Sequence, residues 1–162
     1  MSVSRVIMVT AVAGVLVVEP ARGQDQKAAV VSTVQATFDA MGVRDTNALK
    51  TLLHPKAHLV ATLESGDSTV VRVSTRDEFI AQIARAGPRP LERMWDPEVR
   101  VSGGIATLWA PYDFHTGTTF SHCGIDSVHL ARTPSGWQIT SIIYTVVRPA
   151  DRCPPSPLGA SR

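Results

Sequence analysis

Hydrophobic positions near the start of the chain repeat with a helical period. They are spaced by three, four and three residues and consist of Val31, Val34, Phe38 and Met41. This spacing places all four on one face of an α-helix, which Gly42 ends. A second, short helix is predicted next, because Asp45 and Thr46 can cap its start and Pro55 stops it at the preceding residue. Its buried side is formed by Leu49, Leu52 and Leu53.

A hairpin and a third helix are predicted in the next part of the chain. Residues 57–64 and 69–73 are rich in apolar and β-branched residues and flank the turn sequence SGDS, so they predict two strands. Thr75 and Glu78 form a capping box ahead of further apolar residues. The helix that they open is expected to end at Gly87-Pro88.

The remainder of the chain has the pattern of β-strands. Short breaks rich in Gly, Thr, Pro and Ser separate four strand signals, which lie near residues 91–102, 105–115, 119–132 and 136–147. Breaks of this length join antiparallel neighbours. The order of elements predicts one α+β domain over residues 24–148, followed by a Pro-rich tail at residues 149–162 that lacks regular structure.

Residues 1–23 have the organisation of a signal peptide. A basic n-region precedes an apolar run over residues 6–18, and the small residues Ala21 and Gly23 precede a predicted cleavage after Gly23. The run has about 13 residues, whereas a membrane-spanning helix needs about 20, so an uncleaved anchor is the weaker alternative. The sequence therefore predicts an exported protein, either secreted or periplasmic.

Charge and hydropathy exclude two classes of partner. The formal net charge is +2 and the pI is near 8.8, with basic residues scattered along the chain. A nucleic-acid partner is not expected, because such proteins usually gather basic and aromatic residues on one face. No stretch after residue 23 is long and apolar enough to span a bilayer, so no membrane partner is expected after signal cleavage.

The chain has two cysteines, Cys123 and Cys153. In an exported chain an even count favours a disulfide. That bond would close a loop of about 30 residues and stabilise the fold through chain entropy, and it would hold the tail against the domain. The alternative is two unpaired thiols, one of them in a core strand.

Three stretches of sequence resemble one superfamily. They are RDTNALKTLLHPKAHLV with the helix before it, the strand IATLWAPYDFH followed across a tight turn by FSHCGIDSVHLART, and the closing strand GWQITSIIYTVV. With the order of elements, they make residues 27–148 similar to the nuclear transport factor 2-like (SnoaL-like) superfamily. The most similar members are small exported bacterial proteins described only as "putative lumazine-binding" or as of unknown function.

The resemblance implies a cone-shaped α+β barrel. In this fold a strongly curved, mainly antiparallel six-stranded sheet wraps round three helices, and a mostly apolar pocket between them opens at one end. The resemblance also implies a homodimer that forms through the outer face of the sheet. It does not fix an activity, since one fold hosts many functions.

Four polar residues flank one tight turn and could carry chemistry. Asp113 and His115 share one face of their strand, because side chains alternate along a strand. His122 and Asp126 share one face of the next strand for the same reason. Pairing across the turn places Asp113 opposite His122, and Trp109 near Asp126. A one-residue shift in register or a bulge would reverse that relation.

If these side chains point inward, they form a carboxylate–imidazole set in an apolar cavity. Burial shifts both kinds of pKa toward neutrality, where general acid–base transfer is efficient. Dehydratases of the superfamily use Asp, His and Tyr for such steps, so the resemblance adds a phenol from Tyr112 or Tyr144. The catalytic candidates are Asp113, His115, His122, Asp126 and Tyr144. The polar set could instead position a ligand without catalysis, or form only structural hydrogen bonds.

Aromatic residues supply further candidates for a ligand site. The ligand-binding candidates are Trp95, Trp109, Tyr112, Asp113, His122 and Asp126. The aromatic members could stack on a flat ligand, although packing in the core is the simpler role for most of them. No His, Cys or Asp spacing matches a known metal site, so neither a metal nor a cofactor is expected.

The sequence leaves three functional hypotheses open. The first is an exported protein that holds a small apolar or aromatic ligand. The second is a lyase or isomerase that uses an Asp/His/Tyr set in the same pocket. The third is a dimeric interaction module without catalysis, whose pocket would be filled by its own side chains.

Overall fold

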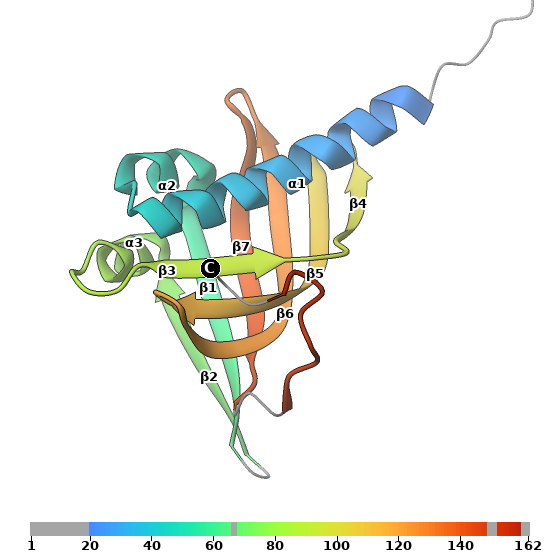
Figure 1. Cartoon of the computed structure of the whole chain (residues 1–162). Helices are drawn as coiled ribbons and strands as arrows, with labels where there is room; N and C mark the ends of the chain where they lie inside the picture. The colour runs from blue at the N-terminus through green and yellow to red at the C-terminus, as the bar shows by residue number, and fades with distance from the viewer. Residues whose placement is uncertain (1–19, 66–67, 149–151, 160–162) are drawn as a thin grey trace, which may run out of the picture.

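Three helices and seven strands make up the part of the chain that the computed structural model describes, residues 20–65, 68–148 and 152–159. The helices are α1 (Pro20–Val43), α2 (Thr46–Leu52) and α3 (Arg76–Ile83). The strands are β1 (Leu53–Ser65), β2 (Ser68–Thr75), β3 (Pro90–Met94), β4 (Glu98–Ser102), β5 (Ile105–Thr116), β6 (Thr119–Thr133) and β7 (Gly136–Val146). The α+β class and the order of elements are as predicted (Figure 1).

The predicted signal peptide and the predicted tail are only partly covered by the described residues. Residues 1–19 of the predicted signal peptide lie outside the described residues, and residues 20–23 form the start of α1. Cleavage after Gly23 would therefore remove the first turn of α1, and it stays a prediction. Within the predicted tail, the described residues 152–159 contain no α-helix or β-strand.

The two short helices begin where capping residues predict. The Asp45 side chain accepts hydrogen bonds from the backbone N–H groups of Asn47 at 3.0 Å and Ala48 at 2.9 Å, which satisfies two free donors at the start of α2. The capping box of α3 is complete. Glu78 accepts from the Thr75 N–H at 2.8 Å, and the Thr75 hydroxyl accepts from the Glu78 N–H at 3.3 Å.

Both helices end earlier than predicted. Leu53, expected on the buried side of the second helix, is already the first residue of β1. The third helix was expected to reach Gly87, but α3 ends at Ile83. A turn occupies the residues between Ala84 and Gly87.

The strands form one strongly curved sheet in the order β2-β1-β7-β6-β5-β3, and β4 also pairs with β5 (Figure 1). Every pairing is antiparallel except that of β1 with β7. The sheet is open, because β2 and β3 end the order without pairing with each other. The predicted cone therefore comes from curvature and not from closure of a barrel.

The predicted strand over residues 91–102 is two strands, so the described sheet has seven strands and not six. Asp96 has a φ of 44°, which a continuous strand does not allow. The adjacent Pro97 has no N–H to donate to a ladder. The break leaves Trp95 between β3 and β4, where its N–H donates to the Pro111 carbonyl at 3.2 Å.

The core lies between α1 and the concave face of the sheet (Figure 1). Three of the four residues of the predicted α1 stripe are buried, and Val31 packs partly buried against the same cluster. The fully buried apolar residues of the sheet come mainly from β1, β5, β6 and β7 and include Leu53, Leu108, Val128 and Ile139. The helical period read from the sequence therefore identifies the correct face of α1.

A β-bulge changes the predicted register of β5 and β6. His115 pairs with Phe120, but Phe114 pairs with His122, so Ser121 is an extra residue on β6. Beyond the bulge Asp113 lies opposite Cys123 and not opposite His122. The predicted pairing was wrong because it counted residues evenly from the turn, and one inserted residue reverses the face relation.

Candidate functional site

A cavity of about 240 Å³ opens between the helices and the concave face of the sheet. Its apolar wall is formed by Phe38, Met41, Leu59, Phe79, Ile83, Phe114 and Ile142. Its polar lining is formed by Ser74, Gln82, Glu92, Tyr112, Ser121, His122, Asp126, Tyr144 and Arg148. The cavity thus has a mixed apolar and polar lining, and its charged groups come from β3, β6 and Arg148, just after β7.

The predicted site residues are divided between the two faces of the sheet. Tyr112, His122, Asp126 and Tyr144 line the cavity. The other candidates do not line it, and they are Trp95, Trp109, Asp113 and His115. The bulge explains this division, because it places Asp113 and His115 on the convex face while His122 and Asp126 face inward.

The two tryptophans among these candidates have other environments. Trp109 lies on the convex face, where its side chain is 53% exposed, opposite Ser127 and not Asp126. Trp95 is half-buried in the break between β3 and β4. Neither side chain stacks over the cavity, so the predicted ligand contact of these two residues does not fit the structure.

Glu92 is a cavity residue that the sequence analysis missed. It stands on β3 beside Arg93, and alternation turns Glu92 inward and Arg93 outward. Its carboxyl group donates a hydrogen bond to Asp126, which lies on β6 on the far side of β5. The strand pattern near residue 92 carries a period-2 signal, but only the folded sheet brings the two carboxyl groups together.

Burial governs the protonation of this carboxyl pair. Burial raises the pKa of Glu92 well above its usual range, and the neighbouring Asp126 charge raises it further. Burial also raises the pKa of Asp126 to about 7, against the opposing effect of the hydrogen bond from Glu92. The pair therefore retains at least one proton near neutral pH.

The Tyr112 side chain on β5 is held by a hydrogen bond that reaches past β6 to the backbone of β7. Its hydroxyl donates to the Thr145 carbonyl at 2.7 Å, and Tyr112 lies opposite Gly124 on β6. A side chain at Gly124 would collide with the same Thr145 carbonyl oxygen. Gly124 thus allows β6 and β7 to approach closely while the tyrosine reaches across, and the Tyr112 hydroxyl is engaged in the fold.

His122 lies among aromatic rings at the cavity wall. Its ring stacks on Phe114 with centroids 4.9 Å apart and meets the edge of Tyr112 at 5.8 Å. Its Nδ1 lies 3.0 Å from the Ser121 hydroxyl oxygen. Burial, with a smaller effect from the Arg148 charge, lowers the pKa of His122 to about 4, so the imidazole is neutral at physiological pH.

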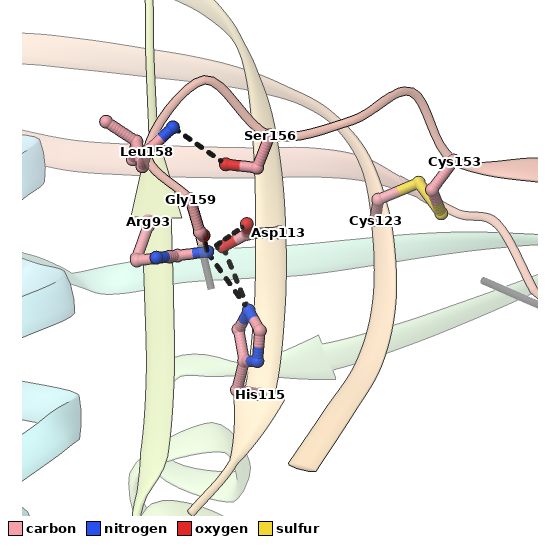
Figure 2. Close-up of polar contacts among 8 residues, drawn as sticks. All are labelled: Arg93, Asp113, His115, Cys123, Cys153, Ser156, Leu158 and Gly159. Carbon is pink, nitrogen blue, oxygen red and sulfur yellow. Dashed lines mark hydrogen bonds and ion pairs between the residues drawn. A yellow bond between two sulfur atoms is a disulfide. The ribbon is translucent and has the colours of Figure 1, made fainter. Parts of the chain in front are cut away.

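The outward-facing candidates form a separate cluster with the tail (Figure 2). Arg93 donates two hydrogen bonds to the Asp113 carboxylate, at 2.8 and 2.6 Å, and one to the Gly159 carbonyl at 2.9 Å. The His115 Nε2 atom lies 3.3 Å from the Asp113 carboxylate. Burial opposes ionisation of Asp113, but hydrogen bonds from Arg93 and Ser156 and the Arg93 charge outweigh it and lower the pKa of Asp113.

The predicted disulfide between Cys123 and Cys153 is confirmed, and it ties the tail to the convex face of β6 (Figure 2). Beyond Cys153, the tail residues Ser156 and Gly159 contact the Arg93–Asp113 ion pair. Under this cover the Asp113 side chain is only 4% exposed.

Within residues 20–65, 68–148 and 152–159, no three His, Cys, Asp or Glu side chains are placed to hold a metal ion. In that same part of the chain, no helix has the length and apolar character needed to cross a membrane.

Sequence comparison supplies a family. Residues 25–145 match the family model described as "Putative lumazine-binding". No protein with a curated function matches the chain.

Solved structures share the fold at low sequence identity. An NTF2-like protein with a cystatin-like fold from Novosphingobium aromaticivorans has a TM-score of 0.63 and 16% identity, over 80% of this chain and 87% of its own. An NTF2-like protein of unknown function from Silicibacter pomeroyi has a TM-score of 0.56 and 22% identity, over 76% and 98% of the two chains. A "putative dehydratase" of the NTF2-like family from Streptomyces avermitilis has a TM-score of 0.60 and 18% identity, over 78% and 99%.

Proposed function

We propose, for a chain that belongs to the family described as "Putative lumazine-binding", that it is an exported protein which holds one small, mostly apolar ring compound. The observation that carries this proposal is the cavity of about 240 Å³ between the helices and the sheet. A dry cavity of about 150 Å³ can hold benzene, so this one has room for one or two fused rings. Apolar walls combined with convergent polar groups are typical of a ligand site.

The open cavity favours a ligand over the interaction-module hypothesis. A pocket that had lost its role would be expected to fill with side chains, because cores pack densely. Here Asp126 and Glu92 are held in an apolar interior, which costs free energy unless the groups are used or paired. A ligand with a polar edge would give these carboxyl groups a role.

Export is supported by the N-terminal sequence and by the disulfide. Residues 1–23 have the pattern of a signal peptide, and disulfides persist mainly in oxidising compartments. The Cys123–Cys153 bond therefore suits a secreted or periplasmic location.

A homodimer is supported by apolar side chains on the convex face of the sheet. Ile105, Trp109 and Ile143 are 66%, 53% and 42% exposed. Trp109 and Ile143 stand in one row across β5, β6 and β7, since both pair with Ser127. Exposed apolar groups of this size on one sheet face suit contact with a second copy.

Acid–base catalysis is a second candidate function, favoured by Asp126. A base is most effective when its pKa lies near the working pH, and burial brings the pKa of Asp126 to about 7. The predicted Asp/His/Tyr set is reduced, however, because Asp113 and His115 face away from the cavity. A lyase or isomerase would rest on Asp126 with Glu92 as its proton-bearing neighbour, and Tyr144 in the wall.

A native mass spectrum of protein expressed with residues 1–162 in an exporting host tests the main proposal. The expected species is a dimer of residues 24–162 with the disulfide formed and a small adduct of stoichiometric mass. The variant Ser74→Trp, which fills the cavity from β2, should lose the adduct. Ser68→Trp, on the exposed end of the same strand, should keep it.

Two results would count against the ligand cavity. One is an adduct that Ser74→Trp leaves unchanged. The other is wild-type protein that carries no adduct and whose melting temperature is not raised by any added compound of one or two rings.

A further inference from the structure

The β-bulge in β6 brings two neighbouring side chains into the same cavity. Side chains alternate along a regular strand, so Ser121 and His122 would otherwise face opposite sides of the sheet. Because Ser121 is the inserted residue, both side chains line the cavity. The Ser121 hydroxyl oxygen lies 3.0 Å from Nδ1 of His122. Bulges are frequent beside functional sites, where they re-aim a side chain in this way.

Two aromatic contacts hold the His122 ring in one orientation. Phe114 on β5 is the register partner of His122, and the two rings stack with centroids 4.9 Å apart and planes 20° from parallel. The Tyr112 ring meets the imidazole nearly at a right angle, with centroids 5.8 Å apart. These two contacts fix the plane of the ring, and Ser121 fixes the side to which Nδ1 is turned.

The other ring nitrogen of His122 is open to the cavity. Nε2 makes no hydrogen bond within residues 20–65, 68–148 and 152–159. Among the side-chain nitrogen and oxygen atoms of unexposed residues in these ranges, only Asp126 Oδ2 and Ser141 Oγ lack both a partner and accessible surface. Nε2 therefore keeps accessible surface, and a small molecule in the cavity that His122 lines can reach it.

The groups next to Nδ1 decide which ring nitrogen carries the proton. Arg148 donates to the Ser121 hydroxyl oxygen at 3.4 Å, which places a positive charge on the Nδ1 side of the ring. This charge favours a lone pair on Nδ1, and the Ser121 hydroxyl can donate its own proton to that lone pair. Burial lowers the pKa of His122 to about 4, so the ring is neutral at physiological pH. Its single N–H is then on Nε2, which can donate but cannot accept.

We propose that His122 is the specificity-determining donor of the cavity, and that it selects a ring compound whose carbonyl oxygen accepts a hydrogen bond from Nε2–H. This inference rests on the proposed function, since it needs the cavity to hold a ligand. Ser121 and Arg148 are positioning residues, because they act on the ligand only through the tautomer of His122. The Tyr144 hydroxyl also lines the cavity, but a hydroxyl can donate or accept and so discriminates less. A ring without an acceptor would remove water from Nε2–H and leave it unpaired, which disfavours binding.

Two bicyclic probes of nearly equal shape test the donor. Indanone carries one carbonyl oxygen, and methyleneindane replaces that oxygen with a methylene group, which cannot accept a hydrogen bond. In calorimetry on the mature, oxidised protein, indanone should bind about tenfold more tightly, as expected for one buried hydrogen bond. In His122→Phe, which keeps a ring against Phe114 but removes the donor, the two probes should bind equally.

Two further histidine variants make the comparison specific. His129→Phe changes an exposed histidine on the same strand, outside the cavity, and should keep the tenfold preference for indanone. His122→Gln carries a side-chain N–H that can replace the one on Nε2, so it should recover part of the preference that His122→Phe loses.

The positioning role has its own pair of variants. Ser121→Ala removes the hydroxyl next to Nδ1 and should reduce the preference for indanone. Ser127→Ala removes a hydroxyl on the convex side of the same strand, opposite Trp109, and should leave the preference unchanged. Equal preferences in these two variants would overturn the role of Ser121.

The tautomer itself can be measured in the ligand-free wild type. NMR of the imidazole nitrogens distinguishes a protonated ring nitrogen from an unprotonated one, and His122→Gln identifies the signals of His122 by their loss. The proton should be on Nε2, and Ser121→Ala and Arg148→Met should each raise the share of the Nδ1–H form. A wild-type ring with its proton on Nδ1 would overturn the inference, whether or not the His122 variants fold.

The outcomes separate this inference from the proposed function. Equal binding of indanone and methyleneindane to the wild type would overturn the donor recognition and leave the ligand cavity standing. A preference that survives in His122→Phe would overturn it as well. Binding of neither probe would count against the cavity as a ligand site, and the role of His122 would fall with it.

Discussion

Removing the disulfide should destabilise the protein by a calculable amount. Cys123 and Cys153 are separated by 30 residues, and the loop between them contains the whole of β7. In the chain-entropy model a cross-link that closes a loop of this length stabilises by about 3–4 kcal/mol at 25 °C. Replacement of Cys153 by Ser is the cleaner single change, because Cys123 is buried in β6 while Cys153 lies on the tail.

Equilibrium unfolding in guanidinium, without reductant, measures this loss. The free energy of unfolding of Cys153→Ser should be lower than that of the wild type by about 3–4 kcal/mol. For a domain of this size the same loss corresponds to a melting temperature lower by roughly 10 °C. Reductant should bring the wild type to the value of the variant and leave the variant unchanged.

The tail provides a local readout of the same change. In the oxidised protein the Gly159 carbonyl accepts from Arg93, and this contact depends on the anchor at Cys153. Amide hydrogen exchange over residues 152–159 should speed up in Cys153→Ser. Equal stability of the two proteins without reductant would refute the reasoning, because it would mean that the bond does not restrict the unfolded chain.

Two other substitutions test packing and charge. Gly124→Ala should lower the free energy of unfolding by about 1–3 kcal/mol, as overpacking does. The control Gly104→Ala, which has open space around it, should cost far less in the same guanidinium titration. Equal costs would contradict the close approach of β6 and β7. Asp113→Asn should cost about 3 kcal/mol, near the lower end for a broken buried pair, because Arg93 keeps 16% of its side-chain exposure. Since the pKa of Asp113 is lowered in the folded state, this stabilisation is present above the unfolded pKa of about 4 and is lost as the pH falls below it. The difference between wild type and Asp113→Asn should thus stay constant from about pH 8 to about pH 5 and shrink below about pH 4. A difference that already shrinks well above about pH 5 would contradict the assignment to Asp113.

Local signals in the sequence predict most of the fold. The period of the α1 stripe, the caps at Asp45 and Thr75 and the short breaks between strands depend only on neighbours in the chain, so they can be recognised from the sequence. The break at Asp96-Pro97 had a signal too, because a proline in a run of strand residues disfavours a continuous strand. The open edge between β2 and β3 has no such signal, since closure depends on the curvature of the whole sheet.

The candidate site was harder to predict for the same reason. His122 and Asp126 were placed together correctly because they lie on one strand, two pleats apart. Asp113 and His115 were grouped with them on an assumed register, and the extra residue at Ser121 has no clear mark in the sequence. Glu92 meets Asp126 only because β3 and β6 both pair with β5, a relation that strand alternation alone does not give.

The two polar clusters are linked through the edge strand β3. Glu92 and Arg93 are neighbours on a strand of five residues that ends the order of the sheet. Arg93 is the register partner of Asp113 and is bound to it through two hydrogen bonds. This bidentate pair on the convex face holds β3 in register on β5, and alternation then places Glu92 on the concave face over the cavity. The disulfide-anchored tail adds the Gly159 contact to the same arginine, so the outer cluster holds in place the strand that carries Glu92 beside Asp126.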